Sequence, residues 1–293
     1  MDIKVKFAIF LFIVTDAILV GYLFLRNKTI AVFEPAGTVA LQERNVFVFA
    51  ILLGLSVVVP IVLFTFFIAW KYRADNQTAK YAPDWDQSWG IEIFRWGLLC
   101  GVIGILAVVT FIVAHTLDPY KPLASNIKPV NIQVVALQWR WLFIYPEQHI
   151  ATIDYIAIPE KTPVNLELTA DAPMNSIWIP QLVGQIYAMA GMSTKTHLMV
   201  NTPGKFQGSD AEISGKGFAG MKFFVQSMNG EDFNSWVAKV KQSPKKLTRA
   251  EYEKLAKPST NTGVSYYVLQ DDNLYNEIMM KFMGPPGSRG MQM

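Results

Sequence analysis

Few side chains in this sequence have the chemistry to bind a transition metal. The chain of 293 residues has one cysteine, Cys100, and three histidines, His115, His149 and His197. A single cysteine excludes an internal disulfide, and no two of these residues have the close spacing of a Cys/His zinc cluster. We therefore expect surface or packing roles for the three histidines and no metal site built from them.

One glutamate stands where it could move protons. Glu92 lies at the start of a long apolar run, three residues before Arg95. Helical spacing would place both side chains on one face. The pair could be an interfacial salt bridge, which contributes little where water reaches it. Alternatively, an ionisable group at a membrane boundary can collect and relay protons, and the spacing alone leaves both roles open.

Two long apolar runs predict the helices that would position Glu92. Val46 to Trp70 contains no charged residue, and as a helix it would be about 37 Å long, enough to cross a bilayer core. Ile91 to Ala114 is the second predicted span, and the short polar segment between the runs predicts an antiparallel hairpin within residues 29–118. The composition agrees, because 52% of the residues are hydrophobic and only 17% are charged.

Basic residues predict the orientation of this hairpin. Lys71, Arg73 and Lys80 lie in the connecting segment, and Arg95 lies just inside the second run. The positive-inside rule places this segment in the cytoplasm and the chain from Thr116 onward outside it.

An earlier apolar run, Phe7 to Leu25, lies within residues 1–28 and follows two lysines. This pattern is typical of both a signal peptide and a signal anchor. Because no A-x-A-like cleavage site follows the run, we favour an uncleaved signal anchor over a cleaved signal peptide.

The rest of the chain predicts a β domain with helices at its end. Short β-rich runs separated by turn residues predict a sandwich or barrel over residues 119–229. The expected strands are Val130–Leu137, Trp141–Tyr145, Thr152–Ile158, Val164–Thr169, Gln185–Met189, Lys195–Val200 and Lys222–Gln226. Residues 230–293 predict a helical extension packed on this domain, with helices at Glu231–Lys241, Thr248–Ala256 and Asn273–Met283. The net charge of +3 is small and scattered, so the sequence does not favour nucleic-acid binding.

Four segments are similar to a known family. Gln138 to Pro146 (QWRWLFIYP) resembles the aromatic segment of subunit II of haem-copper oxidases. Pro173 to Pro180 (PMNSIWIP), Gln185 to Met192 (QIYAMAGM) and Ser214 to Phe223 (SGKGFAGMKF) resemble the version in cytochrome bo-type quinol oxidases. The resemblance covers about Glu34 to Lys281 and implies that the β domain is a cupredoxin-like sandwich.

The resemblance identifies the positions at which copper-bearing relatives hold a dinuclear copper site. Those relatives carry one histidine in a first loop and then a C-x-E-x-C-x-x-x-H-x-x-M run. In this sequence the six corresponding positions are occupied by Asn175, Ile213, Gly215, Gly217, Met221 and Phe224. Soft thiolate and imidazole ligands suit copper, and aliphatic groups cannot replace bridging sulfurs. We therefore expect no copper in this chain and a former ligand pocket filled for packing.

The resemblance also implies a function. The chain would be subunit II of a proton-pumping ubiquinol oxidase of the aerobic respiratory chain, in a bacterial inner membrane, with its β domain in the periplasm. Haems and copper would reside in subunit I, its main partner, which oxidises ubiquinol and reduces oxygen to water. Subunits III and IV and membrane lipid would be further partners. In this family a glutamate at the position of Glu92 lies at the mouth of the K-type proton path.

Two alternatives belong to other classes. The chain could be a copper-bearing subunit II of a cytochrome c oxidase, which the absent cysteines argue against. It could also be a membrane-anchored binding or scaffold protein outside respiration. Trp139 and Trp141 are expected to be packing and interface residues, although a residual contact with quinol or a partner is the functional alternative.

Overall fold

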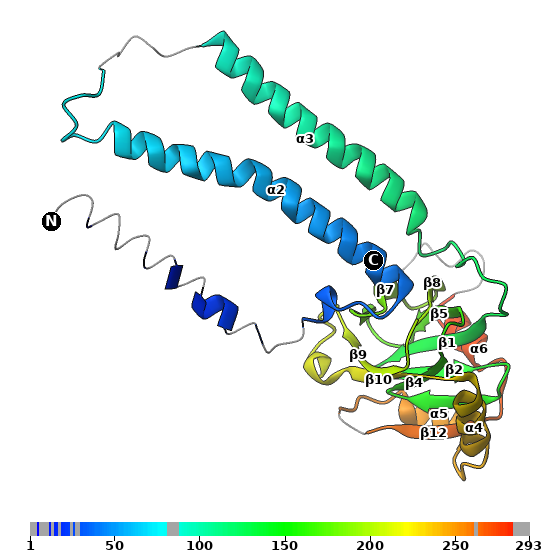
Figure 1. The fold of residues 1–293 in the computed structure, drawn as a ribbon. Coiled ribbons are helices and arrows are strands. Elements are labelled where there is room, and N and C mark those ends of the chain that lie inside the picture. The colour runs from blue at the N-terminus through cyan, green and yellow to red at the C-terminus, as the bar shows by residue number, and fades with distance from the viewer. Residues whose placement is uncertain are drawn as a thin grey trace.

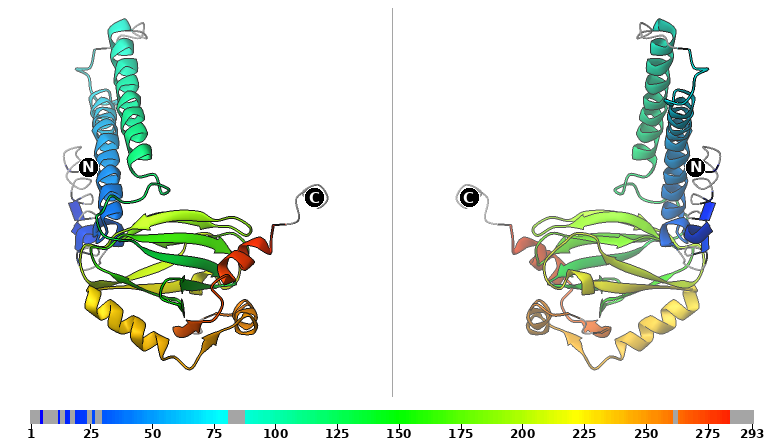
Figure 2. Two further views of the ribbon diagram at one scale, coloured as in Figure 1. Left: turned by 90° about the vertical axis from the view of Figure 1, so that its right-hand side faces the viewer. Right: turned by 90° about the vertical axis from the view of Figure 1, so that its left-hand side faces the viewer.

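A computed structural model describes residues 5, 12, 15–16, 19–23, 26, 30–80, 88–260 and 263–283. Most of the expected signal anchor or signal peptide, residues 1–28, therefore lies outside the described residues. Two long helices, α2 (Thr38–Lys71) and α3 (Trp89–Thr116), project from a two-sheet β domain. Figures 1 and 2 show both helices on the same side of that domain.

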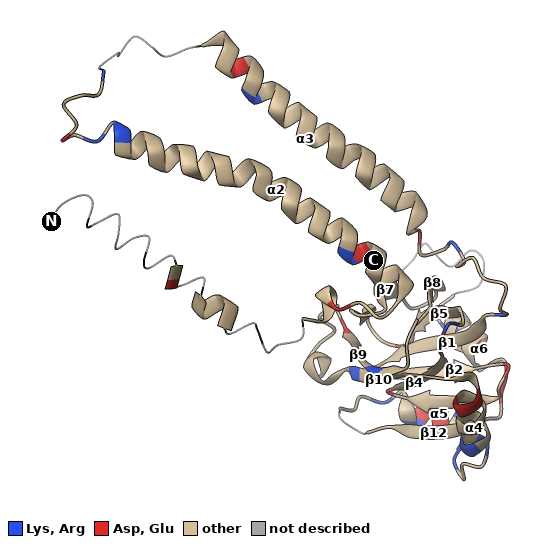
Figure 3. Cartoon of the chain, viewed as in Figure 1, with Lys and Arg blue, Asp and Glu red and all other residues tan. Residues whose placement is uncertain are grey.

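The two helices are apolar on all sides, and their side chains are mostly exposed. Both are long and apolar enough to cross a membrane, and at their lengths of 34 and 28 residues they reach about 51 and 42 Å. Charged residues on α2 occur only near its ends, and those on α3 only near its start (Figure 3). This chain covers little of either helix, and exposed apolar surfaces of this size mark sites of contact with a membrane or another protein. The two predicted apolar helices are confirmed, and their passage through a membrane stays a prediction.

The β domain consists of two sheets. The first has seven strands in the order β11-β12-β3-β2-β1-β5-β8, and the second has five in the order β4-β10-β9-β6-β7. The bounds are β1 (Val130–Leu137), β2 (Arg140–Tyr145), β3 (Ile150–Ile153), β4 (Tyr155–Pro159), β5 (Val164–Ala170), β6 (Asn175–Ile179), β7 (Val183–Ala188), β8 (Thr194–Leu198), β9 (Gly204–Asp210), β10 (Lys222–Met228), β11 (Lys246–Leu247) and β12 (Ser265–Leu269). A β sandwich following apolar helices, with short helices at the end, confirms the predicted fold class.

The core between the sheets consists mainly of apolar side chains. It includes Ile132, Trp141, Phe143, Leu168 and Phe223, each at most 1% exposed. Burying a large apolar side chain stabilises the folded state by about 1.5–3 kcal/mol. These residues alternate along their strands with side chains that face away from this core, as the two-residue period of a β-strand requires.

One predicted strand, Thr152–Ile158, is wrong as a single element. Asp154 divides it into β3, in the larger sheet, and β4, in the smaller sheet. The backbone of Asp154 has a φ of 56°, a left-handed conformation that aspartate tolerates better than most residues. Its N–H donates to the Trp141 carbonyl at 2.9 Å, and its Oδ1 accepts from the Trp141 N–H at 2.8 Å. This paired contact turns the chain from one sheet to the other.

The segment after residue 229 is more than a helical extension. Besides α4 (Gly230–Lys241), α5 (Arg249–Leu255) and α6 (Leu274–Met280), it supplies β11 and β12 to the larger sheet. A second core on the outer face of that sheet includes Leu142, Tyr252 and Ile278. Figure 2 shows α4 and α5 on the side of the sandwich away from the membrane helices. The prediction of a purely helical extension therefore needs correction.

The start of α2 is joined to the sandwich through backbone hydrogen bonds. The Gly37 N–H donates to the Gln181 carbonyl at 3.0 Å, and the Thr38 N–H donates to the Met199 carbonyl at 3.1 Å. A Cβ atom at Gly37 would lie 2.6 Å from the Leu182 carbonyl oxygen, so this close approach requires glycine. The joint fixes the first membrane helix relative to the β domain.

Candidate functional site

Two of the positions that correspond to copper ligands, Gly215 and Gly217, lie against the side chain of Trp139. Trp139 occupies the turn between β1 and β2 with a φ of 68°, and its indole Nε1 donates to the Ser214 carbonyl at 3.2 Å. A Cβ atom on Gly217 would lie 2.3 Å from Trp139 Cδ2, and one on Gly215 would lie 3.4 Å from Cζ2. The indole therefore occupies the space that a side chain at position 217 would need.

A buried carboxylate organises the loop that follows β9. Asp210 is 5% exposed. Its Oδ1 accepts from the Ser176 N–H at 2.8 Å, and its Oδ2 accepts from the Ser214 hydroxyl at 3.1 Å. Burial raises the pKa of Asp210, and these hydrogen bonds oppose the rise. The carboxylate links the strand that carries Asn175 to the loop that carries Gly215.

The six positions do not all line one pocket. Asn175 and Met221 are each 1% exposed, whereas Ile213 is 81% exposed and Phe224 is 38% exposed. Phe224 lies on the outward face of β10, where Lys205 Nζ is 3.9 Å from its ring centroid. The expectation of a pocket packed by all six residues is therefore wrong for Ile213 and Phe224. The indole of Trp139 fills the space beside Gly217.

The residues present do not fit a dinuclear copper site. Asn175 Nδ2 donates to the Pro173 carbonyl at 2.6 Å, and Asn175 Oδ1 is buried with no hydrogen-bond partner in the part of the chain that the structure describes. One amide oxygen and the thioether of Met221 are the remaining donors, and neither can replace two bridging thiolates. Within the described part of the chain, no group of three or more His, Cys, Asp and Glu residues could hold a metal ion.

The three histidines lie apart, and each has its own partner. His115 Nδ1 lies 2.8 Å from the Phe111 carbonyl, and His149 Nδ1 lies 2.9 Å from Asp272 Oδ1. His197 Nδ1 lies 2.7 Å from Asn165 Oδ1. Burial lowers the pKa of His197, which lines the junction between the helices and the sandwich. These contacts agree with the predicted surface and packing roles.

Glu92 and Arg95 form an ion pair on one face of α3, as their spacing predicts. Both side chains are substantially exposed, and Arg95 also lies 5.9 Å from the ring centroid of Trp96. Trp89, Glu92, Ile93 and Trp96 share one groove at this end of the helix. The pairing is consistent with either role considered for Glu92.

Two aspartates of this region were not found by sequence reasoning. Asp210 anchors the loop, and Asp154 sets the corner between β3 and β4. An aspartate at a strand end is common in turns, so the sequence carried no signal that Asp210 would be buried and Asp154 half-buried.

A pair of apolar helices joined to a β sandwich without copper ligands defines a membrane-anchored class of protein, and comparison with known proteins identifies the family. The chain is 50% identical over 264 residues to cytochrome bo(3) ubiquinol oxidase subunit 2 of Pseudomonas putida, an alignment covering 90% of this chain and 84% of that protein. It is 44% identical over 262 residues to ubiquinol oxidase subunit 2 of Acetobacter aceti, covering 89% and 85%. The chain belongs to the family of ubiquinol oxidase subunit 2.

Two further matches concern parts of the chain. Residues 241–286 match the family described as the COX Aromatic Rich Motif, which spans the end of α4 through α6. The crystal structure of the periplasmic domain of subunit II of a cytochrome oxidase from Bradyrhizobium japonicum has a TM-score of 0.38 and 19% identity, covering 41% of this chain and 96% of that one.

Proposed function

We propose that this chain is the anchoring subunit of a proton-pumping ubiquinol oxidase of the aerobic respiratory chain. Family membership supports this function, because relatives aligned over most of the chain are named as subunit 2 of a ubiquinol oxidase. The exposed apolar surfaces of α2 and α3 fit a membrane complex in which subunit I and lipid cover them. Haems and copper would be held by subunit I.

We further propose that the chain carries no redox cofactor and takes no part in electron entry. The packing of Trp139 against Gly217 carries this proposal, because it occupies the space of a ligand side chain. Ubiquinol is lipid-soluble and can deliver electrons from the bilayer, so a copper relay on the water side is not needed. The copper-bearing cytochrome c oxidase alternative is not favoured.

The proposed orientation places the sandwich in the periplasm and the loop between α2 and α3 in the cytoplasm. Lys71 and Arg73 at the loop end of α2 support this orientation by the positive-inside rule. Subunits III and IV are proposed as additional partners. Glu92, at the cytoplasmic start of α3, is proposed to supply protons to the path through subunit I.

One experiment tests the function as a whole. A tagged chain is purified in mild detergent, its partners are analysed for haem, and oxygen uptake is measured with ubiquinol and with reduced cytochrome c. We expect a haem-bearing large subunit to copurify and oxygen uptake to depend on ubiquinol alone. Copurification without haem would instead support the scaffold alternative, and uptake driven by cytochrome c would support the copper-bearing one.

A further inference from the structure

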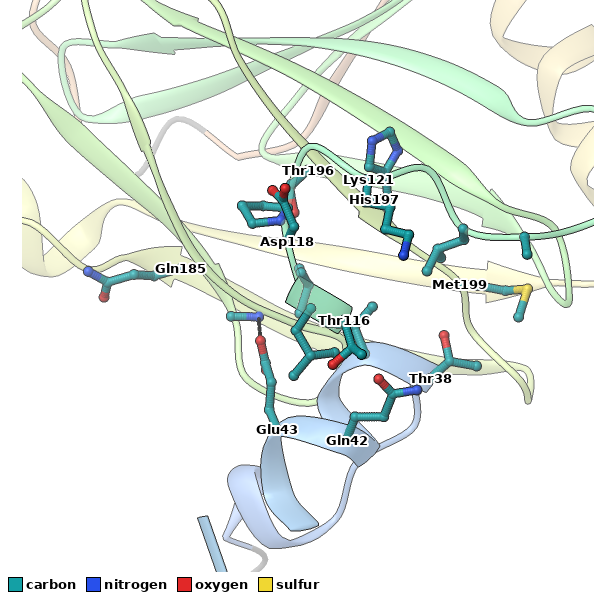
Figure 4. Close-up of a pocket in the computed structure, with 17 residues that line it drawn as sticks. Thr38, Gln42, Glu43, Thr116, Asp118, Lys121, Gln185, Thr196, His197 and Met199 are labelled. Atoms are coloured by element: carbon teal, nitrogen blue, oxygen red, sulfur yellow. Dashed lines mark hydrogen bonds between the residues drawn. The ribbon is translucent and has the colours of Figure 1, made fainter. Parts of the chain in front are cut away.

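A cavity of about 420 Å³ lies where the two membrane helices meet the sandwich. Its walls come from the first turns of α2, the end of α3, the exit segment after Thr116, and strands β7 and β8 (Figure 4). The apolar runs of both helices end at this level. The cavity therefore lies at the headgroup level of the bilayer, on the side of the sandwich.

Charges of both signs line this cavity without neutralising one another. Glu43 rises from α2, whereas Asp118 and Lys121 come from the exit segment (Figure 4). None of these three side chains forms an ion pair with any residue in the described ranges. A molecule that carries both an anionic and a cationic group could contact both kinds of side chain at once.

The arrangement of Glu43 leaves one carboxylate oxygen for such a molecule. Oε1 accepts from the Gly184 N–H at 3.1 Å, which holds the side chain between α2 and β7. A Cβ atom on Gly184 would lie 2.5 Å from this oxygen, so a larger residue there would displace the Glu43 side chain. Burial raises the pKa of Glu43, and a bound cation would favour its ionised form.

Two polar side-chain atoms in the wall of the cavity do not form hydrogen bonds with the described residues. Among the described residues, Thr38 Oγ1 and His197 Nε2 have no hydrogen-bond partner of good geometry, although the Tyr120 backbone lies near the histidine ring. His197 itself is 8% exposed. Buried polar groups are normally satisfied by protein, water or ligand, which favours a polar molecule in this cavity.

We propose that the cavity binds the headgroup of a zwitterionic phospholipid with a primary amine. Lys121 would contact the phosphate, and Glu43 and Asp118 would accept hydrogen bonds from the ammonium group. The acyl chains would lie along the exposed apolar side chains of α2 and α3. Such a lipid would stabilise the junction between the hairpin and the sandwich. The proposal rests on the membrane location in the proposed function, but it does not depend on which electron donor the complex uses.

Lipid retention by the intact complex tests this proposal. The oxidase is reconstituted in nanodiscs with equal parts phosphatidylethanolamine, phosphatidylcholine and phosphatidylglycerol and then transferred to mild detergent. Retained lipid per haem is measured by mass spectrometry. We expect preferential retention of phosphatidylethanolamine and a loss of about tenfold in Lys121→Ala, the effect of one charge-assisted contact.

Two variants make the result specific. Glu43→Gln keeps an oxygen that can accept from Gly184 and should also reduce retention of phosphatidylethanolamine. Lys128→Ala removes a lysine that pairs with Glu147 away from the cavity and should retain as much lipid as the wild type.

Equal retention in all variants, as expected if a segment of subunit I fills the cavity, would overturn the proposal. Retention of phosphatidylglycerol or phosphatidylcholine in place of phosphatidylethanolamine would also overturn it. Oxygen uptake with ubiquinol in the same samples tests the proposed function separately.

Discussion

The indole of Trp139 lies directly against the backbone of Gly217, where a Cβ atom would come within 2.3 Å of Trp139 Cδ2. In copper-bearing relatives the position of Gly217 is a cysteine, according to the resemblance on which the ligand positions rest. In this chain the two residues form one packing unit. The indole can take this position only because residue 217 has no side chain, and therefore no thiolate.

The first prediction concerns this contact. Gly217→Ala should destabilise the sandwich by about 1–3 kcal/mol, because the added methyl group must displace the indole. The melting temperature of the solubilised complex, followed by tryptophan fluorescence, measures the effect. Gly230→Ala is the matched control, since a Cβ atom there meets nothing within 4 Å. In a Trp139→Ala background the cost of Gly217→Ala should disappear, and a cost that persists would contradict the packing argument.

The second prediction concerns the corner at Asp154. Burial raises the pKa of Asp154 to about 6. The folded state therefore binds this proton more tightly than the unfolded chain does. The resulting contribution to the free energy of unfolding is fully present below the ordinary aspartate pKa and is lost as the pH rises through about 6.

Asp154→Asn should remove this pH dependence and stabilise the sandwich at pH 7 by up to about 3 kcal/mol. Asparagine tolerates the positive φ and keeps an acceptor for the Trp141 N–H. The measurement is the difference in unfolding free energy between wild type and variant from pH 4 to pH 8. Asp154→Ala, which loses the acceptor, should be less stable than Asp154→Asn from pH 4 to pH 8. A constant difference between wild type and Asp154→Asn would contradict the prediction.

The third prediction concerns the attachment of the C-terminal segment. The Tyr252 hydroxyl donates to Asp171 Oδ2 at 2.5 Å, and Lys281 Nζ lies 2.7 Å from Oδ1 of the same carboxylate. Burial and the neighbouring carboxylate raise the pKa of Tyr252, so it remains a donor at any physiological pH. Tyr252→Phe should cost about 1–3 kcal/mol and increase hydrogen exchange across α5 and β12. Tyr187→Phe, at a tyrosine that is 40% exposed, should leave both unchanged.

The fourth prediction separates the two roles of Glu92. If the carboxylate relays protons, Glu92→Ala should slow proton uptake while the oxygen-reducing centre is reduced, and assembly should remain intact. Arg95→Ala breaks the same ion pair but keeps the carboxylate, so it should retain most of the uptake rate. A pH-sensitive dye in stopped-flow reduction measures both variants. Normal uptake in Glu92→Ala would remove the proton role, and equal losses in both variants would assign the effect to the ion pair.

Local patterns were sufficient to predict the membrane helices and most strands. Long uninterrupted apolar runs specify α2 and α3, and the alternating run of β1 was predicted with its observed bounds. Strands β6, β9, β11 and β12 were missed, and β12 pairs with β3, which is distant in sequence. β9 contains two glycines and little apolar alternation. The break at Asp154 depends on a contact with Trp141 that no local pattern contains.

The sequence located the site only as six positions that correspond to the copper ligands of the copper-bearing relatives. The residue types at these positions were enough to argue against copper. They did not reveal that Ile213 would face solvent or that Trp139 would fill the space beside Gly217, since both depend on how the loops fold over β1 and β2. The role of Asp210 depends on the same long-range packing.

The central claim is that the sandwich holds no copper and receives no electrons. Its most direct test is the ratio of copper to haem iron in the purified complex, together with the visible spectrum of the isolated full-length chain after exposure to copper under reducing conditions. We predict a ratio accounted for by subunit I alone and no copper absorbance from this chain. Additional stoichiometric copper in the complex, with the absorbance of a thiolate-bridged or other dinuclear centre on this subunit, would contradict the account.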